Sequence, residues 1–287
     1  MEQKKAKEYL IPEKLEEVLE LLADRQNELC IVAGATDVYV GENNGVNGYL
    51  DISKTGLAYI DETENYIALG ACTTFDEIIR SELMKKEAGC LWMAAKQLAD
   101  KTIRNVATVG GNVCNAVPSG DAISPLVALD AEFVMISKNG ERKMKAEDFF
   151  VGVRKIQLKS DEILKEIQIP RKEKLQSSVF MKQGRNSEDI AIVNVAVNLL
   201  LDENGKVSDI RIANGAVAPT VVRATELEKS LIGESLNEQC IDENIDKIEK
   251  SISPITNVRG TAEYRMDISK VYTKRSILQA YNEIKEK

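Results

Sequence analysis

Apolar residues near the start of the chain recur at helical spacing. Pro12 precedes this segment, and proline favours the first turn of a helix. The apolar positions are Leu15, Val18, Leu19 and Leu22. They fall on one face and predict an amphipathic helix that packs on the strand after it. Beyond Ile52 the pattern changes to short apolar runs such as residues 66–69, which are typical of strands.

The middle of the chain alternates between helical and strand signals. Thr74 and Glu77 form a capping-box pattern, which predicts that a helix begins there. Residues 91–98 are apolar on most faces and predict a buried helix. Asn139-Gly140 lies between two strand-like runs and predicts a hairpin.

The last third of the chain predicts a sheet covered by helices. Residues 190–201 alternate in polarity and predict a long strand, and a turn at 202–205 leads into a second strand at 207–216. We expect helices from about Val221, Asn237 and Gly260. A charged connector at 171–176 divides the chain, so we expect an α+β protein with domains at residues 1–175 and 176–287.

Composition excludes several kinds of catalytic site. The chain has 287 residues and no histidine, which rules out a Ser-His-Asp triad, a Cys-His dyad and a histidine-ligated zinc within this polypeptide. Its five cysteines contain no C-x-x-C pair, so it encodes neither a zinc ribbon nor a ferredoxin-type cluster. If the protein performs redox chemistry, an organic cofactor must supply it.

Charge and hydropathy indicate a cytoplasmic protein. The formal net charge is −8, and lysines are mixed with glutamates along the predicted helices, so nucleic acid and anionic membranes are poor partners. No apolar stretch approaches the roughly 20 residues needed to cross a bilayer. The charged first residues are not followed by the apolar segment of a secretion signal.

Two segments rich in small residues are the candidate functional elements. The first follows an apolar run and comprises Val32, Ala33, Gly34, Ala35, Thr36 and Asp37. The second begins with Thr108, Val109, Gly110, Gly111 and Asn112 and ends at Asp121. Glycine lets successive backbone N–H groups turn toward an anion, so the pair predicts a binding site for a diphosphate.

Simpler interpretations remain for both segments. The Gly-Gly pair is also typical of a tight turn between a strand and a helix. Asp121 stands where the N-cap of a helix over 123–131 would be, and a cap and a ligand contact can coexist. Neither segment matches the Rossmann or P-loop patterns, so those nucleotide sites are not supported.

The chain resembles the FAD-binding (medium) subunits of the xanthine dehydrogenase and carbon monoxide dehydrogenase family of molybdenum hydroxylases. The family's Ala-Gly-Gly-Thr-Asp pattern is met by residues 33–37, and its Ile-Arg-Asn pattern by residues 103–105. The Thr-Ile-Gly-Gly-Asn pattern is met by residues 108–112 and its closing Gly-Asp by residues 120–121. Further matches lie at 180–185, 215–223, 258–260 and 264–265, in the family's order.

This resemblance implies a fold and a set of site residues. The fold would be an FAD-binding domain of the vanillyl-alcohol-oxidase (PCMH) type in two subdomains, followed by a small α+β domain with an antiparallel sheet. FAD would be bound non-covalently by the two segments together with Asp121, Leu98, Leu164 and Lys182. By default a lysine such as Lys182 would be a solvated surface residue. Cys114 is expected to line the second segment without attaching the flavin, and no protein residue would act as catalyst.

The resemblance also implies partners. An iron–sulfur subunit with 2Fe-2S clusters and a molybdopterin-binding subunit with the molybdenum cofactor would deliver electrons to FAD, and NAD or another acceptor would receive them. A stand-alone flavin oxidase or reductase is the alternative, and the absence of histidine argues against it. Ala35 departs from the family's glycine; position 35 therefore either has an ordinary φ or sets the loop differently on the phosphates. It is also the only hint of a scaffold that has lost FAD.

Overall fold

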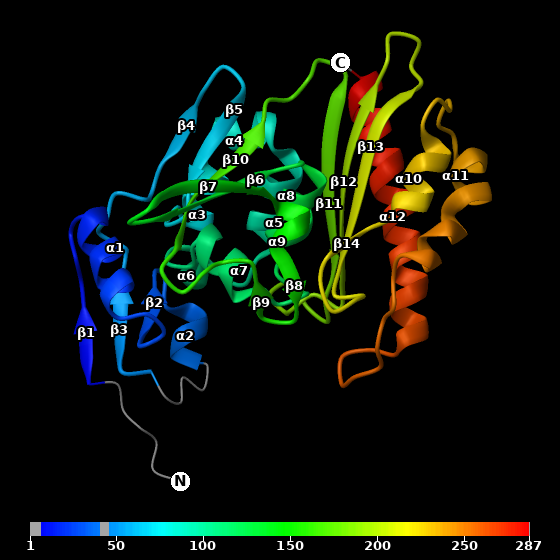
Figure 1. Cartoon of the computed structure of the whole chain (residues 1–287). Coiled ribbons are helices and arrows are strands. Elements are labelled where there is room, and N and C mark those ends of the chain that lie inside the picture. Colours follow the sequence, from blue (N-terminus) through cyan, green and yellow to red (C-terminus); the bar gives the residue numbers. More distant parts are fainter. Residues whose placement is uncertain (1–6, 41–45, 287) are drawn as a thin grey trace.

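A computed structural model describes residues 7–40 and 46–286 of the chain (Figure 1). The strands are β1 (Glu8–Leu10), β2 (Leu29–Val32), β3 (Gly48–Asp51), β4 (Ile60–Glu62), β5 (Tyr66–Gly70), β6 (Glu132–Ser137), β7 (Gly140–Lys145), β8 (Phe150–Gly152), β9 (Lys155–Ile156), β10 (Ile163–Pro170), β11 (Gln176–Gln183), β12 (Val193–Leu201), β13 (Val207–Gly215) and β14 (Val222–Arg223). The helices are α1 (Leu15–Asp24), α2 (Thr36–Val40), α3 (Phe75–Arg80), α4 (Glu82–Glu87), α5 (Gly89–Gln97), α6 (Lys101–Arg104), α7 (Val109–Asn115), α8 (Ile123–Ala128), α9 (Ala146–Phe149), α10 (Thr225–Leu231), α11 (Glu238–Asn244) and α12 (Ala262–Lys285), with a 3-10 helix at Ile245–Lys250.

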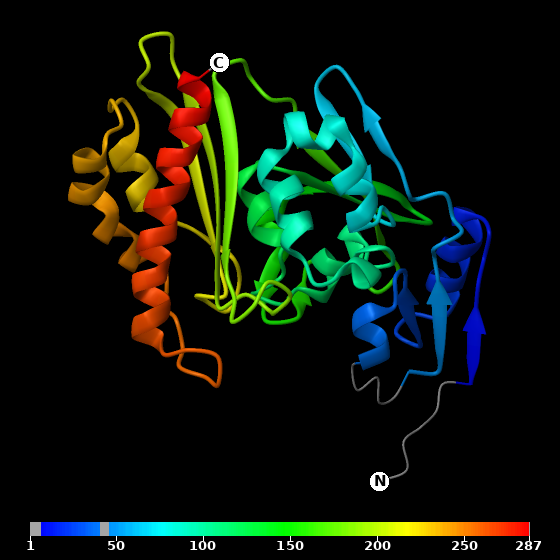
Figure 2. The same ribbon diagram turned by 180° about the vertical axis from the view of Figure 1, so that it is seen from behind.

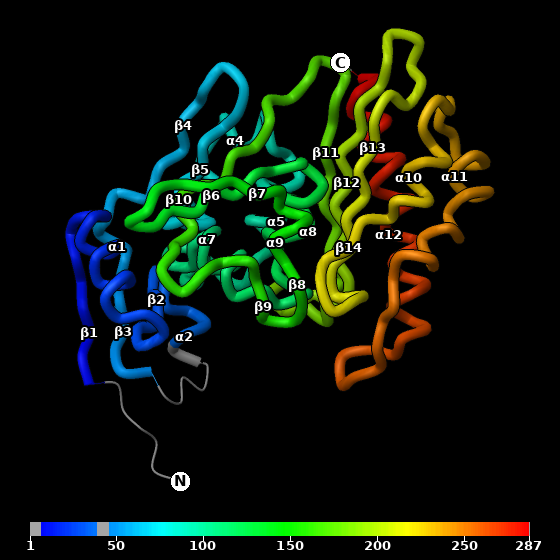
Figure 3. The backbone as a smooth tube through the Cα atoms, viewed as in Figure 1, coloured from blue at the N-terminus to red at the C-terminus, as the bar shows by residue number. Residues whose placement is uncertain are grey.

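The first part of the chain forms a small parallel sheet with the order β1-β3-β2. Helix α1 connects β1 to β2, and the predicted apolar face is confirmed: Val18, Leu19 and Leu22 are buried against residues that include Leu50. The tube in Figure 3 follows the chain out of this part after β3, and no later strand joins its sheet in the part of the chain that the structure describes.

The middle part is a five-stranded antiparallel sheet with the order β4-β5-β10-β6-β7 and helices α3 to α9 around it. The capping box is confirmed: Thr74 Oγ1 accepts from the backbone N–H of Glu77, whose carboxylate accepts from the N–H of Thr74. The hairpin between β6 and β7 is confirmed as well. Its Gly140 has φ +119°, a value that side chains rarely tolerate.

The last part is an antiparallel meander with the order β11-β12-β13-β14, as predicted. Its long strand begins at Val193, later than expected, and is buried on both faces. Figures 1 and 2 show the reason: α12 covers one face of this sheet, and α5 and α8 of the middle part cover the other. Because both faces of this strand are covered, its side chains are buried whichever face they point to. The alternating sequence pattern therefore does not produce alternating buried and exposed residues.

Two helix boundaries differ from the sequence expectation. The helix expected from about Val221 begins at Thr225, because Val222 and Arg223 first pair with β13 as strand β14. The helix expected over 123–131 ends at Ala128, and Asp130 just beyond it has φ +56°. A left-handed residue ends helical hydrogen bonding, which explains the shorter helix.

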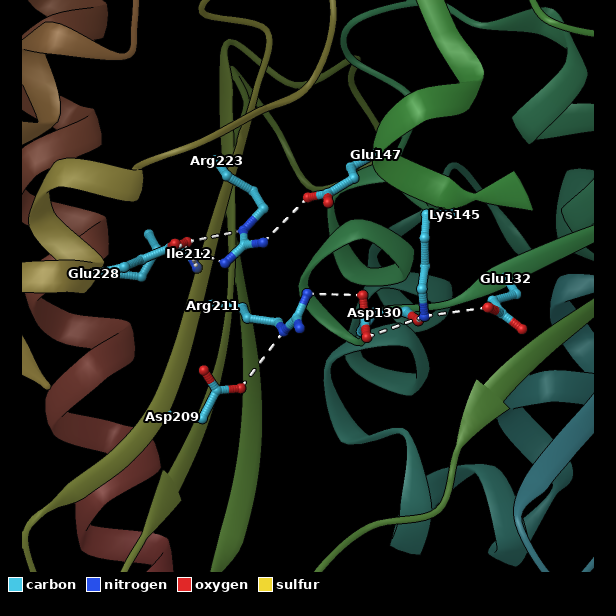
Figure 4. A network of polar contacts seen from close by, with 9 residues as sticks. All are labelled: Asp130, Glu132, Lys145, Glu147, Asp209, Arg211, Ile212, Arg223 and Glu228. Carbon is cyan, nitrogen blue, oxygen red and sulfur yellow. Dashed lines mark hydrogen bonds and ion pairs between the residues drawn. The ribbon is translucent and has the colours of Figure 1, made fainter. Parts of the chain in front are cut away.

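Ion pairs join the middle part of the chain to the last sheet (Figure 4). Arg211 of β13 donates to Asp130 over 2.7 Å, and Lys145 of β7 also contacts Asp130, over 3.2 Å. Arg223 of β14 pairs with Glu147 over 3.1 Å and with Glu228 over 2.7 Å. The two pairs that cross between the parts, Arg211–Asp130 and Arg223–Glu147, are partly exposed. They accompany an apolar contact, because Phe180, Ala196 and Ala213 of the last sheet belong to the core of the middle part.

Candidate functional site

The first small-residue segment links β2 to the short helix α2. A Cβ on Gly34 would stand 1.8 Å from the carbonyl oxygen of Val106, so only glycine permits this contact. Val106 lies just before the second segment. The structure therefore brings the two segments together, although they are about seventy residues apart in the sequence.

The structure shows how Ala35 stands where the family pattern has glycine. Ala35 has φ +58°, so it adopts the left-handed conformation in which a glycine would be unstrained. Within residues 7–40 and 46–286, the backbone N–H groups of Gly34, Ala35 and Thr36 have no hydrogen-bond acceptor. Successive free N–H groups around a left-handed residue form a concave anion-binding nest.

Most of the second segment is helical, whereas the sequence predicts a diphosphate-binding segment or a tight turn. Residues 109–115 form helix α7, with Thr108 as its N-cap. The N–H of Val109 donates to the Thr73 carbonyl and that of Gly110 to the Ala71 carbonyl, each over 2.9 Å. Gly111 and Asn112 donate to Thr108, over 3.1 Å to Oγ1 and 3.0 Å to the carbonyl.

These four bonds use the N–H groups that normally make a helix start attractive to anions. Where the two segments meet, the N–H groups left without an acceptor among the described residues are therefore those of the first segment. The two glycines of the second segment differ in their surroundings: Gly110 is closely packed and Gly111 is exposed. A Cβ on Gly110 would stand 2.5 Å from the Ala71 carbonyl oxygen, whereas Gly111 is exposed and would meet only the Thr108 hydroxyl, at 2.9 Å.

The Asn112 side chain connects this helix start to Asp121. Its Oδ1 accepts from the backbone N–H of Ala122 over 3.1 Å. A Cβ on Gly120 would come within 3.1 Å of the same oxygen, so the chain passes very close at this point. The loop that carries Asp121 is thus held against the first turn of α7.

Asp121 and Lys182 form a buried ion pair. The Lys182 ammonium donates to Asp121 Oδ2 over 2.8 Å and to the carbonyl oxygen of Gln97 over 3.0 Å. The Lys182 side chain is only 4% exposed, so the default expectation of a solvated lysine is wrong. Asp121 does not cap α8 either: the residue at that position is Ala122, which makes no side-chain cap.

The second oxygen of Asp121 has no partner. Its Oδ1 is buried and accepts no hydrogen bond from the described residues. Burial raises the pKa of Asp121 from 3.8 to about 6, even though the nearby Lys182 charge acts to lower it. A buried acceptor without a donor is costly, so this oxygen is suited to a hydroxyl or N–H of a bound ligand.

Leu98 lies beside this pair, immediately after the Gln97 carbonyl. It is buried at the end of α5, and the Arg104 guanidinium donates to the carbonyls of Leu98 and Ala99 over 2.8 and 2.6 Å. Sequence reasoning missed the roles of Gln97 and Arg104. Arg104 could have been found from the Ile-Arg-Asn match at 103–105, whereas a backbone acceptor such as the Gln97 carbonyl leaves no signal in the sequence.

Leu164 is buried on β10, at the edge of this arrangement. Its neighbour Lys165 offers a carbonyl oxygen to the N–H of Ala71 over 3.0 Å, and the Ala71 carbonyl accepts from Gly110. Two hydrogen bonds therefore connect Lys165, the residue after Leu164, through Ala71 to the start of α7. Asp37 is exposed at the other edge, and Val32 and Ala33 lead into the first segment at the end of β2.

The structure gives no support to a reactive cysteine or, in the described residues, to a metal site. The five cysteines are unpaired, and burial raises the pKa of the Cys114 thiol on α7 to about 12, which keeps it protonated and non-nucleophilic. Apart from the few residues left undescribed, no group of three acidic or cysteine side chains could hold a metal ion. In the same range, no helix is both long and apolar enough to span a bilayer.

Comparison with known proteins identifies two family models that follow one another along the chain. The model described as the FAD binding domain in molybdopterin dehydrogenase matches residues 4–172, and the model described as the CO dehydrogenase flavoprotein C-terminal domain matches residues 178–280.

Individual relatives match over nearly their whole length. The medium chain of glyceraldehyde dehydrogenase from Sulfolobus acidocaldarius is 29% identical, covering 96% of this chain and 97% of its own. The FAD-binding subunit of xanthine dehydrogenase from Escherichia coli is 30% identical, covering 93% of each. A chain of carbon monoxide dehydrogenase from Hydrogenophaga pseudoflava superposes with a TM-score of 0.92 at 28% identity, over 98% of this chain and 99% of that one. The expected two-part fold, a PCMH-type domain followed by an α+β domain with an antiparallel sheet, is confirmed.

Proposed function

This chain belongs to the family of FAD-binding medium subunits of molybdenum hydroxylases, and we propose that it passes electrons from iron–sulfur clusters on a partner subunit, through FAD, to NAD or another acceptor. The molybdenum cofactor would be held by a further partner subunit. The proposed division is a flavin domain at residues 1–175 and a C-terminal domain at 176–287.

The observation that carries this proposal is the unpartnered Asp121 Oδ1 beside the two joined segments. FAD offers groups that match both features. Its diphosphate is an anion for the nest at Gly34 to Thr36, and its ribose hydroxyls are donors for a buried carboxylate oxygen. The residues present therefore fit FAD.

We assign roles to the other predicted site residues from their positions in the structure. The proposed site residues are Val32, Ala33, Gly34, Ala35, Thr36, Asp37, Leu98, Thr108, Val109, Gly110, Gly111, Asn112, Asp121, Leu164 and Lys182. Gly34 lets the first segment contact Val106 just before the second, Gly110 lets the start of α7 pack on Ala71, and Asn112 positions the Asp121 loop. Lys182 pairs with Asp121 and would place its ammonium group close to the bound cofactor.

Bound FAD supplies the redox chemistry, because its isoalloxazine ring accepts electrons singly and gives them up singly or as a hydride. The protein would supply binding, orientation and exclusion of water. Leu98 and Leu164 are apolar and buried, so they are suited to shielding the site from solvent.

The first test is the visible absorption spectrum of the purified chain, followed by release of the flavin with heat and its identification as FAD or FMN. We expect non-covalent FAD at about one per chain. The Asp121→Asn variant should bind FAD at least about tenfold more weakly, because the amide weakens the site's acceptor. Asp209→Asn, at a half-exposed position on β13, is the matched control and should bind FAD normally. A colourless protein that cannot be reconstituted with FAD would contradict the proposal.

The proposed partners have a separate test. Purification of the chain from its native source under gentle conditions should bring down an iron–sulfur subunit and a molybdopterin subunit. The flavin of that complex should be reduced when the molybdenum site turns over, and adding NAD should reoxidise it if NAD is the acceptor. Recovery of the FAD-loaded chain alone would favour the stand-alone oxidase or reductase.

A further inference from the structure

The connector between the middle part and the last sheet, residues 171–175, is held by a buried carboxylate. It runs from the end of β10 to the start of β11, at the end of the sheet where α12 also ends (Figures 1 and 2). Glu87, the last residue of α4, is 5% exposed. Its Oε2 accepts from the Arg171 Nε–H and the backbone N–H of Lys172, each over 3.2 Å, and its Oε1 contacts the Lys86 ammonium over 3.1 Å.

Arg171 ties the start of the connector to the hairpin of β4 and β5. Its backbone N–H donates to the Asn65 carbonyl and its guanidinium to the Thr63 carbonyl, each over 3.1 Å. The guanidinium also pairs with Glu62 of β4 over 2.6 Å. Glu87 and Arg171 therefore join three segments of the chain, namely α4, this hairpin and the connector.

The Glu87 carboxylate is ionised at this position. Burial acts to raise its pKa, but hydrogen bonds from Lys86, the Lys172 N–H and Arg171 lower the pKa below its usual value. Hydrogen bonds to an ionised acceptor are roughly twice as strong as those between neutral groups. Loss of the charge weakens all of these contacts together, because they share one acceptor group.

Helix α5 begins two residues after α4 ends and packs along β11. The N–H of Cys90 donates to Ser178 Oγ over 3.1 Å, and a Cβ on Gly89 would stand 3.0 Å from the Ser178 carbonyl oxygen. At the other end of the helix, the Gln97 carbonyl accepts from Lys182 over 3.0 Å. Alternate residues of a strand share one face, so Ser178 and Lys182 both point toward α5. The helix is therefore bonded to β11 at both of its ends.

We propose that Glu87 is a conformational latch. Its charged carboxylate holds the connector against α4 and fixes the start of α5 on β11, and its release opens the connector and separates Cys90 from Ser178. Such an opening is local, because the apolar contact between α8 and the last sheet does not involve these residues. The inference goes beyond the proposed function, since it concerns residues outside the proposed FAD site and is tested without FAD.

Limited digestion of the full-length chain with trypsin measures opening of the connector. Trypsin cuts after Lys172 and Lys174, and mass spectrometry identifies the fragments that end there. Glu87→Gln keeps the shape of the side chain and removes its charge. We expect connector cleavage at least about fivefold faster than in wild type, because cleavage follows the population of the open state. Glu87→Asp keeps the charge on a shorter side chain and should give an intermediate rate.

Hydrogen exchange of the Cys90 amide measures the hold on α5, and its rate should also rise at least about fivefold in Glu87→Gln. The matched control is Glu162→Gln. Glu162 is likewise 5% exposed and pairs with Arg142 over 2.7 Å, and among the described residues its carboxylate contacts Arg142 and Lys159 but not the connector. The control should leave connector cleavage and Cys90 exchange unchanged. Circular dichroism checks folding, and Glu87→Asp carries the same test if Glu87→Gln does not fold.

Connector cleavage and Cys90 exchange at wild-type rates in Glu87→Gln would overturn the inference. The same acceleration in Glu162→Gln would overturn it too, because it would show general loss of stability. Faster cleavage without faster Cys90 exchange would overturn the proposed hold on α5. If the chain fails to bind FAD and Glu87→Gln still has both effects, the proposed function fails while this inference stands.

Discussion

At the scale of single residues, the site depends on a few side chains held in unfavourable surroundings. Asp121 is buried with one oxygen unpartnered, and Ala35 has a backbone conformation that favours glycine. Both features weaken the folded state on their own and persist because the surrounding structure fixes them. Strain of this kind concentrates at functional sites.

The pH dependence of stability tests the environment of Asp121. Folding raises its pKa from 3.8 to about 6, so below pH 3.8 the carboxyl is neutral in both states and carries no penalty. Between pH 3.8 and about 6 the unfolded chain loses this proton while the folded protein keeps it, so up to about 3 kcal/mol of the free energy of unfolding is lost, and the loss is complete above about pH 6. Between pH 4 and 7, wild type should therefore lose stability relative to Asp121→Asn in urea denaturation. Parallel pH profiles for the two proteins would contradict the assignment.

Ala35→Gly tests the strain in the first segment. The substitution relieves the left-handed alanine, and the greater freedom of glycine in the unfolded chain offsets part of the gain. We expect the free energy of unfolding to rise by about 0.5–1 kcal/mol. The control is Ala33→Gly, whose φ is not positive; it should lower stability by about the same amount. A loss of stability in Ala35→Gly would show that position 35 is not strained in solution.

At the scale of elements, the site is assembled where two strand-to-helix connections meet. The first segment touches the chain just before α7 because Gly34 has no side chain, and the N–H groups at the start of α7 are used by Thr108, Ala71 and Thr73. The helix start is thus fixed by internal hydrogen bonds, while the N–H donors of the first segment find no acceptor in the described part of the chain.

Gly34→Ala tests this contact. A Cβ at 1.8 Å from the Val106 carbonyl oxygen cannot be accommodated without moving backbone, so we expect a loss of more than about 2 kcal/mol and defective FAD binding. Thermal and urea unfolding measure the first effect, and flavin titration the second. Gly152→Ala is the matched control, because its added Cβ would meet nothing closer than 3.6 Å. Normal stability and normal FAD affinity in Gly34→Ala would mean that the two segments do not touch.

At the scale of the whole molecule, the two ends of the Asp121–Lys182 pair come from different parts of the chain. Lys182 belongs to β11 of the last sheet, whereas Asp121 lies between α7 and α8 of the middle part. The proposed flavin site therefore depends on how these parts pack. The apolar contact of α5 and α8 with the sheet and the ion pairs around Asp130 hold them together.

Asp130→Asn tests the ionic part of this contact. The substitution removes the charge that Arg211 and Lys145 share, while asparagine tolerates the left-handed φ of position 130. These side chains are partly exposed, so we expect a loss of about 0.5–1 kcal/mol that shrinks in high salt. Asp209→Asn, which faces Arg211 from the same strand, should have a smaller effect. Equal losses at low and high salt would argue against an electrostatic contribution.

The sequence by itself determined the local elements and the family. Periodicity and capping signals predicted α1, the Thr74 cap, the β6–β7 hairpin and the antiparallel meander, because these depend on neighbours within a few residues. The order of short motifs was enough to identify the family of FAD-binding medium subunits.

Only the tertiary structure decided the state of particular site residues. Long-range packing buried Lys182, paired it with Asp121 and placed α12, α5 and α8 on opposite faces of one sheet. It also supplied acceptors for the first N–H groups of α7 and, within residues 7–40 and 46–286, none for those of Gly34 to Thr36. Burial and hydrogen-bond partners come from segments distant in the chain and from backbone carbonyls, which have no counterpart in the pattern of residue types.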